Sequence, residues 1–335
     1  MRYKKTFISL FIITLLLFFV NLSLGSVSIP FKEIYKILTL EGSSKTAWDY
    51  IVLNYRLPKA IVAVLVGMGL SLSGLLMQTL FRNPLAGPYV LGISSGASLG
   101  VAFVVLGAAF LPVALSSFFL SDYGIIIASS LGSFLVLLAV LAVSQRLKDT
   151  MAILIVGLMF GSITTAIVSV LTYFSSAEQL KKFTFWSLGN LGNQSWNSIG
   201  ILTFCSVVGF ILSFLCVKPL NALLLGENYA KSIGVNFNKT KTIIILATSI
   251  LAGSATAFAG PVAFIGLAVP HLAKLFFKTS DHKVLFWATL IFGAMIMLIC
   301  DTIAQMPTFD FVLPINAVTS IIGAPVVIWL LVRKR

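Results

Sequence analysis

The side chains best suited to acid–base or metal chemistry are few in this chain of 335 residues. Its two histidines are His271 and His282, and neither has a second metal ligand at the spacings that zinc sites use. The three cysteines, Cys205, Cys216 and Cys300, lie in apolar runs and also lack such spacing. The patterns H-E-x-x-H and G-x-x-x-x-G-K-[ST], typical of zinc peptidases and phosphate-binding loops, are absent. The sequence therefore predicts no metal site, no cofactor and no catalytic centre.

Ionisable residues inside apolar runs are the usual mark of ion-coupled carriers and of enzymes embedded in membranes. Asp301, near the end of one run, is the main candidate of this kind. A secondary transporter usually needs a midplane site, and an intramembrane enzyme needs clustered ionisable groups. The sequence disfavours both classes and leaves them open as alternatives.

The residues named above lie in or beside long apolar segments. The chain is 59% hydrophobic and 10% charged, so it cannot cover a water-facing surface with polar groups. Apolar runs of roughly 17–25 residues are what a helix needs to cross a lipid bilayer, and the period of two expected of a membrane barrel is missing. We therefore expect an all-α, polytopic membrane protein with about ten transmembrane helices. The predicted spans are approximately 6–25, 58–81, 89–109, 123–145, 150–174, 195–217, 239–259, 262–277, 284–304 and 314–332.

The distribution of charge predicts the orientation of these spans. With the N-terminus placed inside, the inner segments hold sixteen of the 23 Lys and Arg residues and three of the ten acidic residues. Because Lys and Arg in short loops stay in the cytoplasm, both termini are expected to be cytoplasmic. The net charge of +13 is then a topology signal and calls for no nucleic-acid partner. A cleaved signal peptide is the alternative interpretation of the first span.

A polar stretch, FRNPLAGPYVLGISSGASLG (81–100), separates the second and third spans. Pro84 and Pro88 suit a turn and the start of a helix. Gly92, Gly96 and Gly100 follow at a spacing of four, which allows a neighbouring helix to approach closely. The stretch therefore predicts an inner turn followed by a tightly packed helix.

The longest inner loop is KPLNALLLGENYAKSIGVNFNKT (218–240). Its leucines before Gly226 and its amphipathic segment after Gly226 predict two short helices, bent at the glycine, outside the bilayer. An apolar surface of this kind is expected to dock a partner. The alternative is a helix that lies on the surface of the lipid.

Four segments carry a resemblance to a known family. They are RLPKAIVAVLVGMGLSLSGLLMQTLFRNPLAGPYVLGISSGASLG, LNALLLGENYAKSIGV, AGPVAFIGLAVPHLAKLF, and CDTIAQ followed by LPINAVTSIIGAPVVIWLL. In this order they resemble the permease subunits of binding-protein-dependent ABC importers for iron–siderophores, haem and vitamin B12, the FecCD-type permeases. The resemblance runs from Arg56 to the C-terminus.

The resemblance implies the fold and the partners. Residues 1–335 would form one transmembrane permease domain of the vitamin B12 importer type, with a cytoplasmic coupling loop at about 218–240. Its partners would be two ABC ATPase subunits, an extracytoplasmic substrate-binding protein, a second permease copy or paralogue, and the lipid bilayer. ATP hydrolysis would belong to the ATPase chains, so this chain would be a transport subunit and no enzyme.

The resemblance also assigns roles to residues. Those that match the coupling helices, and are expected to dock the ATPase, are Asn221, Leu225, Gly226, Glu227, Ala230 and Gly234. Arg56 and Lys59 match basic residues that meet the binding protein, with interfacial snorkelling as the alternative. The residues expected at the gate or along the translocation path are Asn83, Leu85, Gly92, Gly96, Thr150 and Met151.

Three positions depart from the family pattern. Gln305 stands where members usually have Arg, Lys278 where they often have Gly, and Asn316 where they have Gly after Leu-Pro-x. None removes a transport role. The function implied is import of a ferric siderophore across the cytoplasmic membrane by alternating access, with haem or cobalamin as alternative cargo and an ion-coupled secondary transporter as a further alternative.

Overall fold

The computed structural model describes residues 3–110, 121–147, 150–192, 194–305 and 311–333, and every regular element in these ranges is helical. Seven helices are long and apolar enough to cross a membrane. They are α1 (Lys4–Ser23), α4 (Leu57–Leu80), α7 (Asp122–Arg146), α8 (Thr150–Tyr173), α10 (Trp196–Leu215), α13 (Phe237–Ala259) and α15 (His282–Ala304). Three shorter apolar helices are α5 (Ile93–Val105), α14 (Ile265–Phe277) and α16 (Ile315–Arg333). Together they follow the order of the predicted spans, and the prediction of an all-α polytopic membrane protein is confirmed.

Two predicted spans begin later than expected, for the same physical reason. Residues 88–91 form a 3₁₀ turn, and Gly92 then takes a left-handed backbone conformation with φ of 74° before α5 begins. Phe264 takes a similar conformation, with φ of 65°, directly before α14. Because a left-handed residue interrupts a right-handed helix, hydropathy alone placed both helix starts several residues too early.

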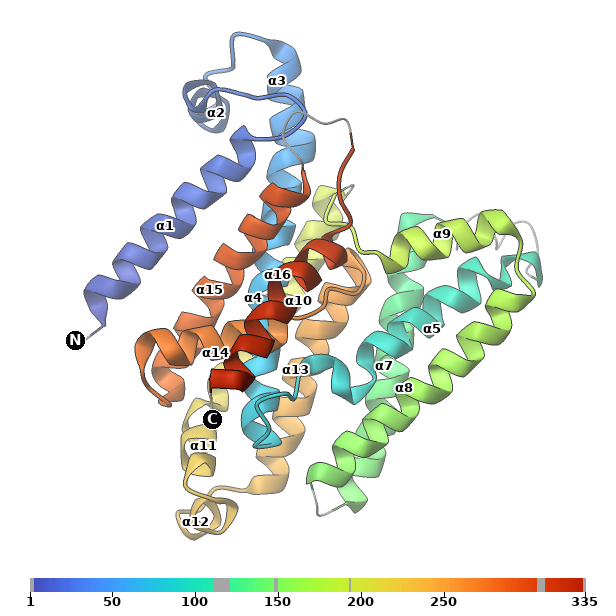
Figure 1. Ribbon diagram of the computed structural model, residues 1–335, viewed down its shortest axis with the longest axis vertical. Helices are drawn as coiled ribbons and strands as arrows, with labels where there is room; N and C mark the ends of the chain where they lie inside the picture. Colours follow the sequence, from blue (N-terminus) through green and yellow to red (C-terminus); the bar gives the residue numbers. More distant parts are fainter. Residues whose placement is uncertain (1–2, 111–120, 148–149, 193, 306–310, 334–335) are drawn as a thin grey trace.

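The interior of the bundle is formed by α4, α13 and α15, while α1 and α8 lie at its periphery (Figure 1). Glycines permit the close approach of the inner helices. A Cβ atom on Gly74 would lie 1.7 Å from the carbonyl oxygen of Gly266, and one on Gly67 would lie 2.3 Å from that of Gly293. The polar and small residues of α4 thus serve helix packing, as expected of a core that avoids lipid.

A short non-helical turn, Gly260 to Phe264, lies between α13 and α14 inside the bundle. Irregular backbone at membrane depth needs partners from neighbouring protein groups. The Tyr89 hydroxyl donates to the carbonyl of Val262 at 2.8 Å and accepts from its N–H at 3.2 Å. Asn316 accepts from the N–H of Ala263 at 3.0 Å. The asparagine that replaces the family's glycine therefore holds this turn.

The segment between α1 and α4 forms a cap at one end of the bundle (Figure 1). It contains α2 (Phe31–Leu38), α3 (Thr46–Ile51) and a π-helical turn (Val52–Arg56). Helix α2 buries Ile34 and Ile37 and exposes Phe31 and Tyr35. This amphipathic pattern lets one face of α2 pack against the bundle. The segment between the first two long helices, in which we recognise no sequence motif, therefore has a structural role.

Helix α1 packs against α15, and the Asn21 amide donates to Asp301 and Thr302 at 2.9 and 3.0 Å. A helix that contributes a buried polar group to the bundle is part of the folded protein. These contacts argue against the signal-peptide interpretation of the first span.

Candidate coupling surface, docking site and translocation path

The predicted inner loop forms α11 (Val217–Leu224) and α12 (Glu227–Ser232), at the end of the bundle opposite α2 and α3 (Figure 1). Gly226 joins them with φ of 116°, a conformation that favours glycine. Around this bend lie exposed apolar side chains. They are Leu224, Leu225, Tyr229 and Ile233. We name these four residues the coupling surface, since an exposed apolar patch outside the spans is suited to a protein partner.

The six residues assigned to ATPase docking differ in their access to a partner. Leu225 is 68% exposed, and Glu227 forms an ion pair with Lys231 at 2.7 Å. Gly226 and Gly234, with φ of 116° and 85°, set the bends at the two ends of α12. Ala230 is fully buried, so a small side chain there lets α12 pack against the bundle. Its assignment to ATPase docking stays a prediction.

Asn221 also makes contacts within the chain. Its amide donates to Asp281 at 2.7 Å, and its oxygen accepts from the backbone N–H of His282 at 2.8 Å. The same oxygen lies 2.9 Å from the imidazole Nδ1 of His282. The Asn221 side chain therefore links α11 to the start of α15 through hydrogen bonds.

The inner turn after α4 is held by Asn83, whose side chain accepts from the N–H of Leu85 at 2.9 Å. Arg82 has φ of 47°, and Leu85 is 45% exposed at the tip of the turn. Met151 is half exposed at the start of α8, and Thr150 is the first residue of that helix, its side chain lying outside the described part of the structure.

The two glycines assigned to the path pack on different helices. A Cβ atom on Gly92 would lie 3.0 Å from the carbonyl oxygen of Gly157 in α8, and one on Gly96 would lie 2.6 Å from that of Gly132 in α7. Residues 92–96 also match G-x-S-x-G, the nucleophile motif of α/β-hydrolases. That motif requires a strand before it, whereas here a 3₁₀ turn precedes the helix.

Helix α8 carries a polar face that the sequence analysis missed. Most of this helix is exposed, and its exposed side includes Ser162, Thr165 and Ser169. Their hydroxyls donate to carbonyls four residues earlier. Together with residues of the 3₁₀ turn at 88–91 and of α5, they line a groove of about 550 Å³, whose members include Tyr89, Gly92, Ser95, Gly157 and Gly161.

A signal for this face was present in the sequence. Gly157, Gly161, Thr165 and Ser169 follow one another at a spacing of four, the same pattern of small residues that drew attention to α5. A polar, small-residue face on a peripheral span is suited to another helix or to a water-filled path, and it is poorly suited to lipid.

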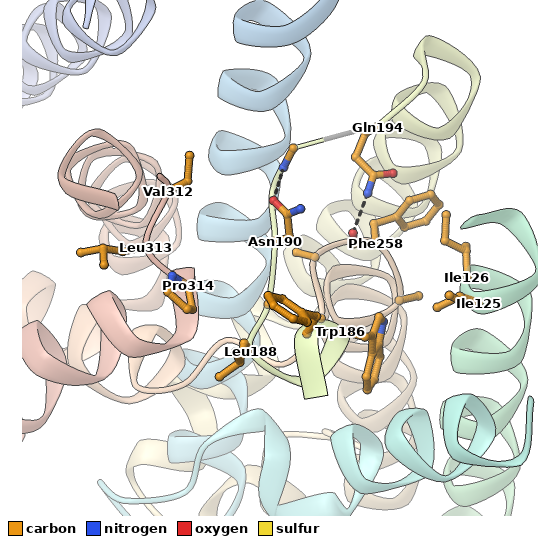
Figure 2. Close-up of a pocket in the computed structure, with 16 residues that line it drawn as sticks. Ile125, Ile126, Trp186, Leu188, Asn190, Gln194, Phe258, Val312, Leu313 and Pro314 are labelled. Carbon is orange, nitrogen blue, oxygen red and sulfur yellow. Dashed lines mark hydrogen bonds between the residues drawn. The ribbon is translucent and has the colours of Figure 1, made fainter. Parts of the chain in front are cut away.

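A second cavity, of about 330 Å³, lies among α7, the end of α9 (Ala177–Ser187), the end of α13 and residues 312–314 (Figure 2). Most of its lining is apolar. Asn190 accepts from the N–H of Gly192 at 2.9 Å, and Gln194 donates to the carbonyl of Phe258 at 2.8 Å. These bonds use the oxygen of Asn190 and the nitrogen of Gln194, and most of the other residues that line the cavity are apolar.

Arg56 and Lys59, the residues expected to meet the binding protein, are engaged inside the chain. Arg56 is only 8% exposed, and its guanidinium donates to the carbonyls of Leu22 and Ser23, at 2.7 and 2.9 Å, and of Val27. Lys59 forms an ion pair with Asp301 at 2.9 Å. Both residues also border a cavity of about 340 Å³, together with Tyr55 and Gln305. Their assignment to binding-protein docking stays a prediction.

Asp301 is the centre of a buried polar cluster. It lies 1% exposed and accepts from Asn21 at 2.9 Å and from Gln305 at 2.8 Å, in addition to its ion pair with Lys59. We name these four residues the aspartate cluster. Gln305, which replaces the family's Arg, thus binds a carboxylate of its own chain. A carboxylate so fully paired is poorly suited to carry protons in an ion-coupled carrier.

Within the described residues, no group of three or more His, Cys, Asp and Glu side chains could hold a metal ion. His282 is buried between Asn221 and the Thr79 hydroxyl, which lies 2.8 Å from its Nε2. The histidines thus have structural partners, and the three cysteines are free thiols.

Comparison with known proteins agrees with this architecture. The model of the FecCD transport family matches residues 13–333. The chain is 34% identical over 327 residues to the hemin transport system permease protein HmuU of Yersinia pestis, covering 97% of this chain and 95% of that protein. It is 36% identical over 283 residues to the vitamin B12 import system permease protein BtuC of Klebsiella pneumoniae, covering 84% and 82% of the two chains.

Among solved structures, a metal-chelate type ABC transporter in an inward-facing conformation is similar, with a TM-score of 0.86, 27% identity, and coverage of 99% of this chain and 100% of that one. The resemblance first seen in four sequence segments therefore extends along nearly the whole chain and to its fold. The chain belongs to the FecCD transport family.

Proposed function

We propose that this chain is the transmembrane permease subunit of an ATP-driven importer that carries a ferric siderophore across the cytoplasmic membrane. The observation that carries the proposal is the exposed coupling surface at one end of the bundle. The family model matches residues 13–333, which include nearly all of the spans. The relatives are named for hemin transport and vitamin B12 import, and the similar structure for a metal chelate. All three names describe metals held in organic ligands, and haem and cobalamin are the alternative cargoes.

The proposed mechanism is alternating access. Two ATPase subunits would hold the coupling loop at about 218–240, and their closure on ATP would move α11 and α12 as a rigid unit. Residues 1–335 would act as one permease domain. The polar face of α8 supports a path between this chain and a second permease copy or paralogue, because that face is unsuited to lipid.

Orientation follows from the charges and from the position of the coupling surface. The start of α1 and the end of α16 lie in the half of the bundle that contains α11 and α12, away from the cap formed by α2 and α3 (Figure 1). The excess of Lys and Arg predicted for that side supports cytoplasmic N- and C-termini. The substrate-binding protein would then meet the opposite end.

The cavity beside Arg56 and Lys59 is the proposed docking site for the binding protein. Its two cations would attract carboxylates of the partner, an arrangement that favours orientation and rapid association. Because both cations already have internal partners, docking would have to compete with those bonds. Cargo selection would rest mainly on the binding protein, since the cavity in Figure 2 offers mostly apolar contact.

The proposal is tested by purification and uptake together. The tagged chain is purified from its native membrane, and uptake of radiolabelled ferric siderophore is measured in cells with Gly226→Val or Glu227→Ala. Co-purification of an ATPase, with uptake lost and membrane insertion intact in the variants, is expected. Uptake of labelled haem or cobalamin that depends on this chain, with no uptake of the labelled siderophore, would assign the alternative cargo. A chain that purifies alone, and transports in vesicles without ATP, would contradict the proposal and favour a secondary transporter.

A further inference from the structure

Three elements meet at the inner end of the bundle through polar side chains. Thr79 lies in the last turn of α4, Asn221 lies in α11, and His282 is the first residue of α15. The buried imidazole of His282 stands between the other two, with Nε2 at 2.8 Å from the Thr79 hydroxyl and Nδ1 at 2.9 Å from the Asn221 amide oxygen. Asp281 completes the group by accepting from the Asn221 amide nitrogen at 2.7 Å.

The direction of each hydrogen bond follows from the chemistry of its partners. A carboxylate only accepts, so the Asn221 nitrogen must face Asp281 and its oxygen must face His282. An amide oxygen also only accepts, so Nδ1 of His282 carries the hydrogen. The single hydrogen of the Thr79 hydroxyl has two acceptors within reach, the carbonyl of Leu75 at 3.0 Å and Nε2 of His282 at 2.8 Å. In a neutral imidazole with its hydrogen on Nδ1, Nε2 is an acceptor, so the hydroxyl donates to it when its hydrogen turns away from Leu75. The four side chains therefore form one connected chain of hydrogen bonds.

We propose that this chain of hydrogen bonds, Thr79 to His282 to Asn221, transmits the movement of α11 to the inner turn after α4. His282 is then a positioning residue of the coupling step. The inference rests on the proposed function, because it assumes that α11 and α12 receive the ATPase. It adds the residues through which the movement would leave the coupling helices.

The geometry on the α4 side favours this role. The carbonyl of Thr79 accepts from the N–H of Arg82 at 3.3 Å, and that of Gln78 accepts from the N–H of Asn83 at 3.2 Å. The last turn of α4 is therefore continuous with the turn that carries Leu85. A displacement of Thr79 would move this turn without passing through any flexible segment.

The rest of the boundary between α11 and α4 is apolar. Leu220 and Leu223 of α11 lie in one buried cluster with Met77 and Leu80 of α4. A cavity of about 90 Å³ lies beside this cluster, lined by Thr79, Leu80, Arg82, Leu223, Glu227 and Phe237. Side chains around a void transmit displacement poorly because they can move into the space. The hydrogen-bonded chain therefore adds a directional polar connection to the apolar contact between α11 and α4.

The competing explanation is that His282 and Asn221 only stabilise the start of α15. Asp281 does cap that helix, since its carboxylate accepts from the N–H of Lys283 at 2.9 Å. A capping role predicts that a variant loses stability but keeps the wild-type ratio of cargo imported to ATP hydrolysed. The proposal instead predicts that this ratio falls while the complex still folds and assembles. A change at Thr79, which lies outside the cap, separates the two explanations.

The experiment uses the full complex of permease and ATPase in proteoliposomes with its binding protein. Thr79→Val keeps the shape of the side chain and removes the hydroxyl. We expect the variant complex to assemble and to hydrolyse ATP, while cargo imported per ATP hydrolysed falls about fivefold, the factor expected for loss of one buried hydrogen bond. Thr79→Ser, which keeps the hydroxyl, should restore the ratio.

A matched control is available in α15. Thr289 is fully buried, and its hydroxyl has no hydrogen-bond partner among the residues that the structure describes. Thr289→Val should therefore leave the ratio of import to hydrolysis unchanged. The double variant Thr79→Val/Asn221→Ala supplies a second measurement, since two changes in one chain of bonds should reduce the ratio no more than the larger single effect.

Nitrogen NMR of the ¹⁵N-histidine-labelled complex tests the hydrogen-bond direction itself, and the chain's two histidines keep its histidine spectrum simple. His282 should carry its hydrogen on Nδ1, and Thr79→Val should shift the Nε2 signal. The opposite tautomer, or an unchanged ratio of import to hydrolysis in Thr79→Val, would overturn the inference. Failure of the wild-type chain to bind any ATPase would instead overturn the proposed function.

Discussion

Replacing Lys59 with methionine asks whether this lysine is a free contact for a partner or a structural member of the aspartate cluster. In the structure Asp301 is 1% exposed and Lys59 lies 2.9 Å from it. Methionine keeps most of the apolar stem of lysine and removes only its charge. The carboxylate of Asp301 then stays buried without its cation.

The magnitude follows from the partners that remain. Removing one member of a buried ion pair typically costs about 3–5 kcal/mol. Asn21 and Gln305 still donate to Asp301, at 2.9 and 2.8 Å, so the cost should lie near the lower end, about 3 kcal/mol. At about 2 °C per kcal/mol for a chain of this size, the thermal midpoint in detergent should fall by about 6 °C.

The neutral variant Asp301→Asn provides the control. Lys59 keeps 15% of its side chain exposed, so its ammonium can turn toward water when the carboxylate is gone, and a smaller loss is expected. The double variant Lys59→Met/Asp301→Asn should be more stable than Lys59→Met alone, because no charge is left buried. A Lys59→Met protein with the wild-type thermal midpoint and weakened affinity for the binding protein would refute this reasoning. It would show that Lys59 acts mainly as a contact for the binding protein.

Three further changes test other parts of the structure. Lys278→Gly should raise the thermal midpoint by the equivalent of about 1 kcal/mol, because Lys278 has φ of 48° at the end of α14 and glycine adopts this conformation at no steric cost; uptake should be unchanged. Asn316→Gly should lower stability by about 1–2 kcal/mol, measured by thermal unfolding, since the N–H of Ala263 loses its partner. The hydrogen bond from the Lys283 N–H, assisted by the Asn221 amide, lowers the pKa of Asp281 below 3.8. The Asp281 carboxylate therefore stabilises the fold at neutral pH, and this contribution disappears as the pH falls through the lowered pKa. The difference in thermal midpoint between wild type and Asp281→Leu should be constant above about pH 5 and should shrink below about pH 4.

The spans were predictable because a lipid environment imposes a length and a composition on each one. The bend at Gly226 was also predictable, since a run of leucines ends there and an amphipathic segment follows. The starts of α5 and α14 were missed because they depend on left-handed backbone at Gly92 and Phe264. Hydropathy does not report backbone conformation, and Phe264 gives no local hint of it.

The hydrogen bonds of Arg56 and the ion pair of Lys59 inside the chain could not be predicted from the sequence, for a different reason. Their partners include Leu22 and Asp301, and Asp301 is far away along the chain. Spacing rules describe neighbours on one helix and cannot pair residues from separate helices. The polar face of α8, by contrast, is predictable from the sequence, because small and hydroxyl residues recur at a spacing of four from Gly157 onward.

The aspartate cluster also has a consequence for how the protein is made. Asn21, near the end of the first span, bonds with Asp301, 280 positions later in the chain. During synthesis the first span therefore enters the membrane before Asp301 in the ninth span has been made. Lys59 in the second span likewise precedes its carboxylate. The aspartate cluster can thus close only late in biogenesis, and a chain stalled before residue 301 would lack this link between its first, second and ninth spans.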